Sequence, residues 1–319
     1  MKSLTGWLRR RLRPAKPADE FGDDLRFFAD TGDLAALMAR AGSVDFWRGL
    51  CPGLTISSNP FAKPPAPLET DDASRLVEQI VEDGYFQTGP LVPPDEIRRL
   101  ADAVSCVTSA GYHPIFASVY DEVWRMLATL GNLLEPILGP GFRVVPDFWL
   151  WHVNAGSERS GWAPHRDHQY PDTLRPDGRP TLITVWIPFT DATPLNSCIY
   201  VLPLSRDPNH PGNLRGMNVD RLQDIRALPA EAGSILGWNQ HLLHWGSRGS
   251  KRSDQPRISL GIYFQSGDVP AFDPLARELA GPLTFEKRLA YIGRALARYD
   301  SHFPLPAPLK TFSLWVRGL

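Results

Sequence analysis

The sequence has few cysteines and no pattern among them. Only three occur in 319 residues, Cys51, Cys106 and Cys198, and they lie far apart. An odd number without a Cys-x-x-Cys pair predicts neither a disulfide framework nor a cysteine metal site. Cysteine usage therefore indicates a reducing compartment, and we expect a cytoplasmic protein.

An excess of charge of one sign is also lacking. Lys and Arg total 34 against 35 Asp and Glu, a net charge of −1, so no overall field would attract nucleic acid or a membrane. No run is apolar enough to cross a bilayer, and the basic N-terminus lacks the apolar core of a secretory signal. We expect no nucleic-acid partner and no integral membrane segment. Residues 1–18 are expected to be a basic solvated tail; the alternative is an amphipathic anchor using Trp7, Leu8 and Leu12.

Internal repeats and low-complexity tracts are absent, and the first part of the chain carries apolar residues at helical spacing. We expect several helices there, with one short extended piece between them and a proline-rich loop at 55–69. The expected helices lie within residues 20–50, 71–84, 93–107 and 120–139, the last one ended by Pro136 and Gly139, and the extended piece is YFQTGPLV at 85–92.

After residue 140 the spacing of the apolar residues changes from helical to every second residue, as in strands. Short segments rich in β-branched and aromatic residues, separated by turn signals, lie at 142–153, 181–189, 197–204, 233–238 and 257–264. Short strands after a helical part predict a mainly β fold with flanking helices, an antiparallel sandwich or barrel. We expect a single domain over residues 19–319. Its parts would be a helical part at 20–140, a β-barrel core at about 142–268 and a C-terminal helix at about 284–300.

The stretch WAPHRDHQY (162–170) carries the first candidate site. In a strand, residues two apart point to the same side, so His165 and Asp167 can reach one point. A third ligand can come from HLLHWGS, where His241 and His244 are three apart and only one of them can join. Two histidines and one carboxylate form the facial triad of non-haem Fe(II) oxygenases. A His-x-Asp alone is more often a surface loop than a metal site.

A second pair of residues follows in QPRISLGIYF. Arg257 and Ser259 are again two apart, so one face of a strand can present a guanidinium and a hydroxyl. This combination is a good receptor for a carboxylate. A 2-oxo acid that chelates a metal through its other end would need such a cation.

The order of these residues resembles the phytanoyl-CoA dioxygenase family of Fe(II)/2-oxoglutarate oxygenases. His-x-Asp is followed by a distal His about 80 residues on and by an Arg 13 residues after that. The stretches TVWIPFTDATPLNSCIYVLPLSRD and RALPAEAGSILGWNQHLLHWGSRGSKRSDQPRISLGIYF are similar to that family, and the resemblance covers roughly residues 75–265. It implies a double-stranded β-helix, a jelly-roll or cupin-like barrel.

The resemblance also implies roles for individual residues. Fe(II) would be bound by His165, Asp167 and His244, and the far carboxylate of the co-substrate 2-oxoglutarate would be bound by Arg257 and Ser259, with Trp186 and Thr184 in the co-substrate pocket. O2 would be the second co-substrate. Two departures from the family occur. Ser205–Arg206 replaces a Ser-His pair, and Trp245 follows the distal histidine, which leaves Ser247 a doubtful contact.

The resemblance also implies that Asp167 favours oxygen insertion, desaturation or another oxidative rearrangement over halogenation, because halogenating relatives replace this carboxylate with a small residue. We expect hydroxylation of an unactivated C–H bond with release of succinate and CO2. The substrate would be a small organic molecule or natural-product intermediate, free or linked to a carrier, CoA or peptide. The alternatives are a non-catalytic barrel and a cupin-type metalloprotein that does not use 2-oxoglutarate.

Some features leave two interpretations open. Trp149 and Trp151 share one face of a strand and are either core residues or part of a substrate pocket. Residues 206–229 form a long irregular segment, either a solvated loop or a lid. As a lid, its Arg215 and Arg221 would meet an anionic substrate.

Overall fold

The computed structural model describes residues 34–63, 65–69, 73–157, 162–167, 172–216, 222–300 and 305–318. The expectations for the N-terminal tail, for residues 20–33 and for Arg221 lie outside these ranges.

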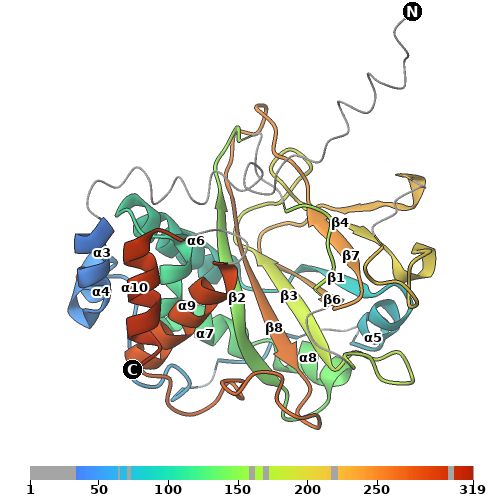
Figure 1. Ribbon diagram of the computed structural model, residues 1–319, viewed down its shortest axis with the longest axis horizontal. Coiled ribbons are helices and arrows are strands. Elements are labelled where there is room, and N and C mark those ends of the chain that lie inside the picture. The colour runs from blue at the N-terminus through green and yellow to red at the C-terminus, as the bar shows by residue number, and fades with distance from the viewer. Residues whose placement is uncertain are drawn as a thin grey trace, which may run out of the picture.

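Two antiparallel sheets form the core of the molecule (Figure 1). The larger has the order β1 (Tyr85–Pro90), β6 (Ser234–Asn239), β3 (Leu182–Pro188), β8 (Arg257–Gln265), β2 (Arg143–Val153). The smaller has the order β5 (Arg226–Leu228), β4 (Ile199–Leu202), β7 (Leu243–Gly246). From β3 to β8 the chain passes repeatedly between the two sheets, with only β4 and β5 successive in one sheet, and this is the expected double-stranded β-helix with flanking helices.

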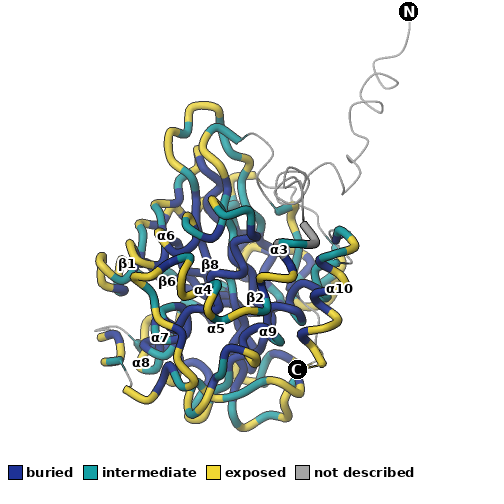
Figure 2. The backbone as a smooth tube through the Cα atoms, turned by 90° about the vertical axis from the view of Figure 1, so that its left-hand side faces the viewer, coloured by how far each residue is buried: buried dark blue, intermediate teal, exposed yellow. Residues whose placement is uncertain are grey.

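The residues of the large sheet explain why it forms the centre. All seven residues of β3, LITVWIP, are buried, and most are β-branched or aromatic, which suits a strand covered on both faces. Between the two sheets lies an apolar cluster that includes Trp186, Val201, Leu236 and Trp238. Figure 2 shows β8 and β2 as largely buried backbone. The functional side chains described below lie on the side of the large sheet that faces this cluster.

Helices pack around the large sheet. In Figure 1, α3 (Leu34–Ala41), α4 (Val44–Leu50), α6 (Pro94–Ser109), α7 (Asp121–Ala128), α9 (Phe285–Tyr299) and α10 (Ala307–Val316) lie on the left, and α5 (Ala73–Glu82) and α8 (Gly131–Leu138) lie toward the lower right. The 3-10 helices are η2 (Pro114–Val119), η3 (Leu204–Arg206) and η4 (Leu222–Asp224). One hydrophobic cluster runs from Met38 to Val316 and includes residues of β2, β3 and β8.

The helical part departs from expectation in two places. The single helix expected at 120–139 is two helices, α7 and α8, and Pro136 lies inside α8. The apolar spacing continues through the turn at Thr129–Gly131, so the period alone does not reveal the break. The helix expected at 284–300 is α9, but it is not the last one. α10 begins after Pro306 with a proline in its first turn, where the missing N–H costs little.

The expectation of no disulfide is wrong. Cys51, which ends α4, is bonded to Cys106 in α6, with 6.5 Å between the two Cα atoms. The partners are 55 residues apart in sequence, and only the packing of α4 on α6 brings them together. The argument for a reducing compartment therefore loses its basis. Within the described residues, every helix is too short or too polar to cross a bilayer.

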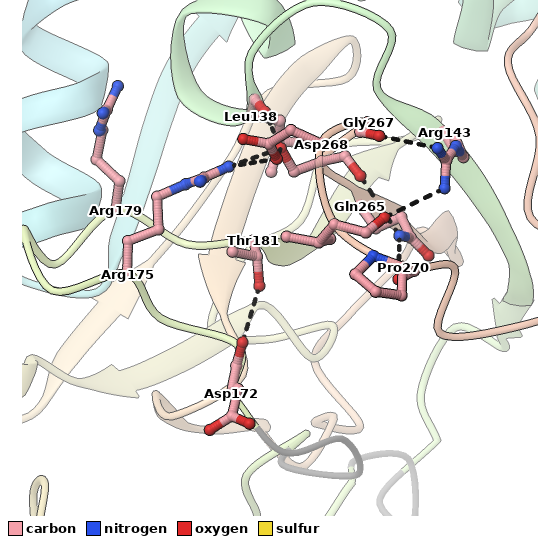
Figure 3. Close-up of polar contacts among 12 residues, drawn as sticks. Leu138, Arg143, Asp172, Arg175, Arg179, Thr181, Gln265, Gly267, Asp268 and Pro270 are labelled. Atoms are coloured by element: carbon pink, nitrogen blue, oxygen red, sulfur yellow. Dashed lines mark hydrogen bonds and ion pairs between the residues drawn. The ribbon is translucent and has the colours of Figure 1, made fainter.

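Residues 172–181, which lead into β3, are fastened to the end of the barrel. Figure 3 shows the Arg175 guanidinium directed toward Asp268, and the two are 2.7 Å apart. Arg143 donates to the Gly267 carbonyl at 2.8 Å, so the segment after β8 is held on two sides. The segment 206–229 was expected to be irregular, but its residues Arg226–Leu228 form β5.

Candidate metal centre and co-substrate site

His165, Asp167 and His244 converge although His165 and Asp167 do not lie on a regular strand. His165 forms an isolated antiparallel bridge with His244 of β7, through two backbone hydrogen bonds of 3.0 Å. One ligand atom from each of the three residues lies within 4.8 Å of the others. The bridge explains the local order: it places the two histidines side by side, and the i, i+2 spacing brings Asp167 to the same point.

The two imidazoles are held in one tautomer. Nδ1 of His165 lies 2.8 Å from the Ala163 carbonyl oxygen, and Nδ1 of His244 lies 3.1 Å from that of Leu242. A carbonyl oxygen only accepts, so each Nδ1 carries the proton and each Nε2 has a free lone pair. Burial lowers the pKa of His244 to about 4, which keeps its ring neutral at pH 7. The Nε2 atoms lie 3.4 Å (His165) and 3.6 Å (His244) from the carboxylate of Asp167.

The carboxylate of Asp167 is oriented by two donors. Oδ2 accepts from Thr184 Oγ1 at 2.6 Å and from the Trp238 indole N–H at 2.9 Å. Burial alone would raise the pKa of Asp167, but the two histidines and the Thr184 hydroxyl lower it, so the group is ionised. Thr184, expected in the co-substrate pocket, therefore contacts Asp167, the candidate acidic ligand.

These donors fit Fe(II). Two neutral imidazole nitrogens and one carboxylate oxygen are the set that non-haem iron oxygenases use, and each has a hydrogen-bonded partner behind it. His165 is the most solvent-accessible of the three residues. The exposed fraction of its side chain is 27%, against 9% for Asp167 and 5% for His244, so the site opens to solvent at His165.

Arg257 lies on the inner face of β8, as predicted, with 5% of its surface exposed. Its Nη1 donates to Ser259 Oγ at 2.5 Å, and the guanidinium carbon lies 5.8 Å from the centre of the Trp186 ring. Gly261 is next on this face, paired with Trp186 on one side and Trp149 on the other. A Cβ at Gly261 would meet nothing nearer than a Trp186 atom at 3.8 Å. The absence of a side chain at Gly261 leaves room for one small group beside the buried Arg257 cation, which is compatible with a small dicarboxylate.

Nothing in the sequence indicated that Cys198 lies near Arg257. Burial raises the pKa of its thiol to about 11, while Ser247 and Arg257 act in the opposite direction because both lie close to it. Ser247 donates its backbone N–H to the Cys198 carbonyl at 3.0 Å, so the residue that the sequence left doubtful lies beside the Arg257 pocket. The preceding Ser197 has a φ of 74°, in the left-handed region.

Aromatic rings flank the open side of the metal centre. Trp162 lies 5.4 Å from the His165 ring, 5.5 Å from Trp151 and 6.0 Å from Tyr299 at the end of α9, as ring-centre distances. All four side chains are partly exposed, whereas Trp149 is buried and stacks on Tyr299 at 4.1 Å. Of the two strand tryptophans, Trp149 is thus a packed residue and Trp151 reaches the open side.

Charges on this side compensate each other. Asp147 of β2 is buried and lies 2.7 Å from Arg298 of α9. Burial raises the pKa of Asp147 to about 6, and the Arg298 cation opposes that shift. A ligand that approaches His165 therefore meets aromatic surface next to a neutralised ion pair.

Other candidates are not brought to the site. His241 lies in the turn before β7, where its ring is 5.6 Å from that of His210. Arg215 is exposed. Two residues near the metal centre, Trp238 and Tyr299, had no signal in the sequence, because strand pairing and the packing of α9 place them there.

Residues 112–259 match the sequence model of the family described as phytanoyl-CoA dioxygenase. No curated protein sequence matches the chain significantly. Among solved structures, the apo form of the non-haem monooxygenase ThoJ is 18% identical, covers 76% of this chain and 99% of its own, and has a TM-score of 0.50. At this identity the likeness shows the fold.

Two further structures are similar at lower scores. The non-haem α-ketoglutarate-dependent carbocyclase SnoK from nogalamycin biosynthesis is 17% identical, with coverage of 69% and 100% and a TM-score of 0.48. EctD from S. alaskensis, solved with 2-oxoglutarate and 5-hydroxyectoine, is 16% identical, with coverage of 67% and 83% and a TM-score of 0.44. Residues 112–259 therefore form a phytanoyl-CoA dioxygenase domain, of a family of oxygenases whose cofactor and co-substrates are Fe(II), 2-oxoglutarate and O2.

Proposed function

We propose that this oxygenase hydroxylates an unactivated C–H bond of a small organic molecule. The observation that carries the proposal is the convergence of His165, Asp167 and His244, with their ligand atoms within 4.8 Å of one another. The buried Arg257 on the same inner face supports the use of 2-oxoglutarate over a cupin-type reaction without it. In this proposal the three converging residues hold Fe(II).

Bound Fe(II), together with 2-oxoglutarate and O2, supplies an oxidant able to remove hydrogen from an unactivated C–H bond, with release of succinate and CO2. The side chains of the protein prepare that site. His165 and His244 keep their protons on Nδ1 and present Nε2, and Asp167 stays ionised because Thr184 and Trp238 donate to Oδ2.

The far carboxylate of 2-oxoglutarate would be held by Arg257 and the Ser259 hydroxyl. A planar guanidinium can meet a carboxylate with two parallel hydrogen bonds, and here it is already fixed by Ser259 and the Trp186 ring. The absence of a side chain at Gly261 leaves space for part of the chain between the two ends of the co-substrate. The apolar cluster between the sheets keeps water away from this pocket.

The substrate would approach on the side of His165, the most exposed of the three residues. Trp162, Trp151 and Tyr299 offer partly exposed rings there, and Asp147 is neutralised by Arg298. These features favour an uncharged, largely apolar group next to the reacting carbon, as in a natural-product intermediate. They leave open whether the rest of the molecule is free or linked to a carrier, CoA or peptide.

We also propose that the chain from residue 19 to residue 319 is one domain. Its support is the hydrophobic cluster that joins the early helices, the large sheet and α10. A separate helical domain would have its own core.

The proposal is tested by adding Fe(II) and 2-oxoglutarate to oxygen-free protein. A chelate should give a weak charge-transfer band at roughly 500–530 nm, as is general for such complexes. Asp167→Asn and Arg257→Met should both weaken it, and Trp315→Phe, an exposed position on α10, should not. Iron binding without the band would favour a metalloprotein that does not use 2-oxoglutarate. No iron binding would favour a non-catalytic barrel.

The reaction type needs a turnover measurement. A panel of apolar small molecules can be screened by succinate release. For an active compound, mass spectrometry should show a product that has gained one oxygen atom. A product that has lost two hydrogens, or one of unchanged mass, would replace hydroxylation by desaturation or rearrangement.

A further inference from the structure

The segment after β4 crosses behind both parts of the chain that carry the candidate metal ligands. We call residues 204–211 the brace. It starts with η3 and lies in the part of the chain where the sequence predicted a solvated loop or a lid. Asp207 and Asn209 in this segment are 6% and 9% exposed, so the brace is packed against the barrel.

Its N-terminal end is fixed to the end of α5. The backbone N–H of Leu204 donates to the Asp83 carbonyl at 2.9 Å, and the Ser205 hydroxyl donates to the Asp83 carboxylate at 2.7 Å. Ser205 is the first residue of the pair in which this chain departs from its family, and here it anchors the brace.

The middle of the brace contacts the His-x-Asp segment through Arg166, the residue between two candidate ligands. Arg166 Nη2 lies 2.5 Å from Asp207 Oδ2, and the exposed fractions of the two side chains are 2% and 0%. Nε and Nη1 of Arg166 have no hydrogen-bond partner among the described residues. Asp207 is therefore what fixes the guanidinium in place, and Asp207 itself is oriented by the Asn209 N–H at 2.9 Å.

The far end of the brace reaches the segment that carries the third ligand. The His210 ring lies 5.6 Å from that of His241, which belongs to the turn between β6 and β7. His244 follows three residues later. One short segment thus contacts both parts of the chain that carry the candidate ligands.

We propose that Arg166 is a positioning residue for the metal centre: its ion pair with Asp207 clamps the His-x-Asp segment to the brace, so that His165 and Asp167 are held in place before metal binds. This inference rests on the proposed metal site. The local order supports it. The bridge to His244 fixes the backbone at His165, Thr184 and Trp238 hold the carboxylate of Asp167, and the ion pair with Asp207 holds the side chain of the residue between them. Groups behind metal ligands commonly change metal affinity 10- to 100-fold when they are removed.

The chain offers a matched control. Arg288 and Asp121 form a second buried pair, 2.6 Å apart with exposed fractions of 0% and 6%, between α9 and the start of α7. Breaking this pair destabilises the protein through the same physical cause, an uncompensated buried charge. It does not touch the brace or the His-x-Asp segment.

The experiment is a Co(II) titration of the full-length metal-free protein, followed by visible absorption. We expect Arg166→Met and the milder Asp207→Asn to raise the Co(II) Kd 10- to 100-fold, and Arg166→Lys to recover part of the loss. Asp121→Asn should leave the Kd within about twofold of wild type. Hydrogen exchange of residues 204–211 in the metal-free protein should increase in Arg166→Met and remain unchanged in Asp121→Asn.

The outcomes separate the two proposals. Wild-type protein that does not bind Co(II) would reject the metal site and this inference with it. Wild-type binding with an unchanged Kd in both Arg166→Met and Asp207→Asn would overturn only the positioning role. Equal losses of affinity in Asp121→Asn and Asp207→Asn would also overturn it, because general destabilisation would then explain both.

Discussion

Among the described residues, Arg288 is a fully buried cation with four polar partners. Its removal should lower the free energy of unfolding by an amount that these partners determine. Its Nη1 lies 2.6 Å from Asp121 Oδ1 and donates to the Val119 carbonyl at 2.6 Å. Nη2 donates to the Ser57 carbonyl at 2.8 Å and Nε to the Leu283 carbonyl at 3.0 Å. Every nitrogen of the guanidinium has a partner, and the group joins α9 to the helices before the barrel.

The magnitudes follow from these partners. Asp121→Ala leaves the Arg288 cation buried without its carboxylate, which costs about 3–5 kcal/mol of the free energy of unfolding. Arg288→Met removes the donors of three carbonyls, and each buried carbonyl without a donor costs about 1–3 kcal/mol. The double variant Asp121→Leu/Arg288→Met removes both charges, but the three buried carbonyls still lack their donors. We therefore expect it to remain at least about 3 kcal/mol less stable than wild type.

The assay is urea unfolding followed by circular dichroism and tryptophan fluorescence. Both probes should show one transition at the same midpoint, because the Met38–Val316 cluster joins the helices to the sheet. A double variant as stable as wild type would refute the reasoning, since the ion pair alone would then account for the effect. Two separate transitions would contradict the single domain.

Three further predictions concern single positions. Ser197→Gly should stabilise the protein by about 1 kcal/mol in urea unfolding, because Ser197 has a φ of 74° and its buried hydroxyl has no partner among the described residues. Gly261→Val should raise the KM for 2-oxoglutarate in a succinate assay about tenfold or more, with a normal circular dichroism spectrum, because its side chain would fill the space beside Arg257. Burial lowers the pKa of His113 to about 3, below its unfolded value near 6.5, so its contribution is complete above pH 6.5 and is lost as pH falls. The free energy of unfolding should fall by about 1.4 kcal/mol per pH unit between pH 6 and 4, and His113→Asn, which can still accept from the Ile115 N–H, should reduce this slope.

The strands and most helices were predictable because they depend on local periodicity. Residues 257–264 alternate, with Arg257 and Ser259 on one face, and β8 covers this stretch with both residues on its inner face. The turn between α7 and α8 was not predictable, because the same apolar spacing continues through it. The disulfide between Cys51 and Cys106 was equally hidden, since sequence spacing carries no information on which helices pack together.

In the candidate site, too, some residues could be located from the sequence and others could not. The i, i+2 rule and the resemblance to a family located His165, Asp167 and Arg257, and the structure brings the first two together with His244. The groups that hold these residues come from pairing and packing. Trp238 reaches Asp167 because β6 pairs with β3, and the register opposes Thr184 to Trp238. Asp207 contacts Arg166 because the brace packs against the His-x-Asp segment, and the sequence carries no sign of this packing.

Asp167 is both a candidate metal ligand and the acceptor of two buried hydrogen bonds. The second role limits which residues can replace it. Its Oδ1 faces His165, while Oδ2 accepts from Thr184 and Trp238 inside the barrel. A small residue at this position, the change that the sequence resemblance links to halogenation, would leave two buried donors without an acceptor, at a cost of about 1–3 kcal/mol each. Asp167→Ala alone should therefore destabilise the protein and give no halogenase. Conversion would also require apolar replacements such as Thr184→Val and Trp238→Phe, so the oxygenase assignment depends on the neighbours of the carboxylate as much as on the carboxylate.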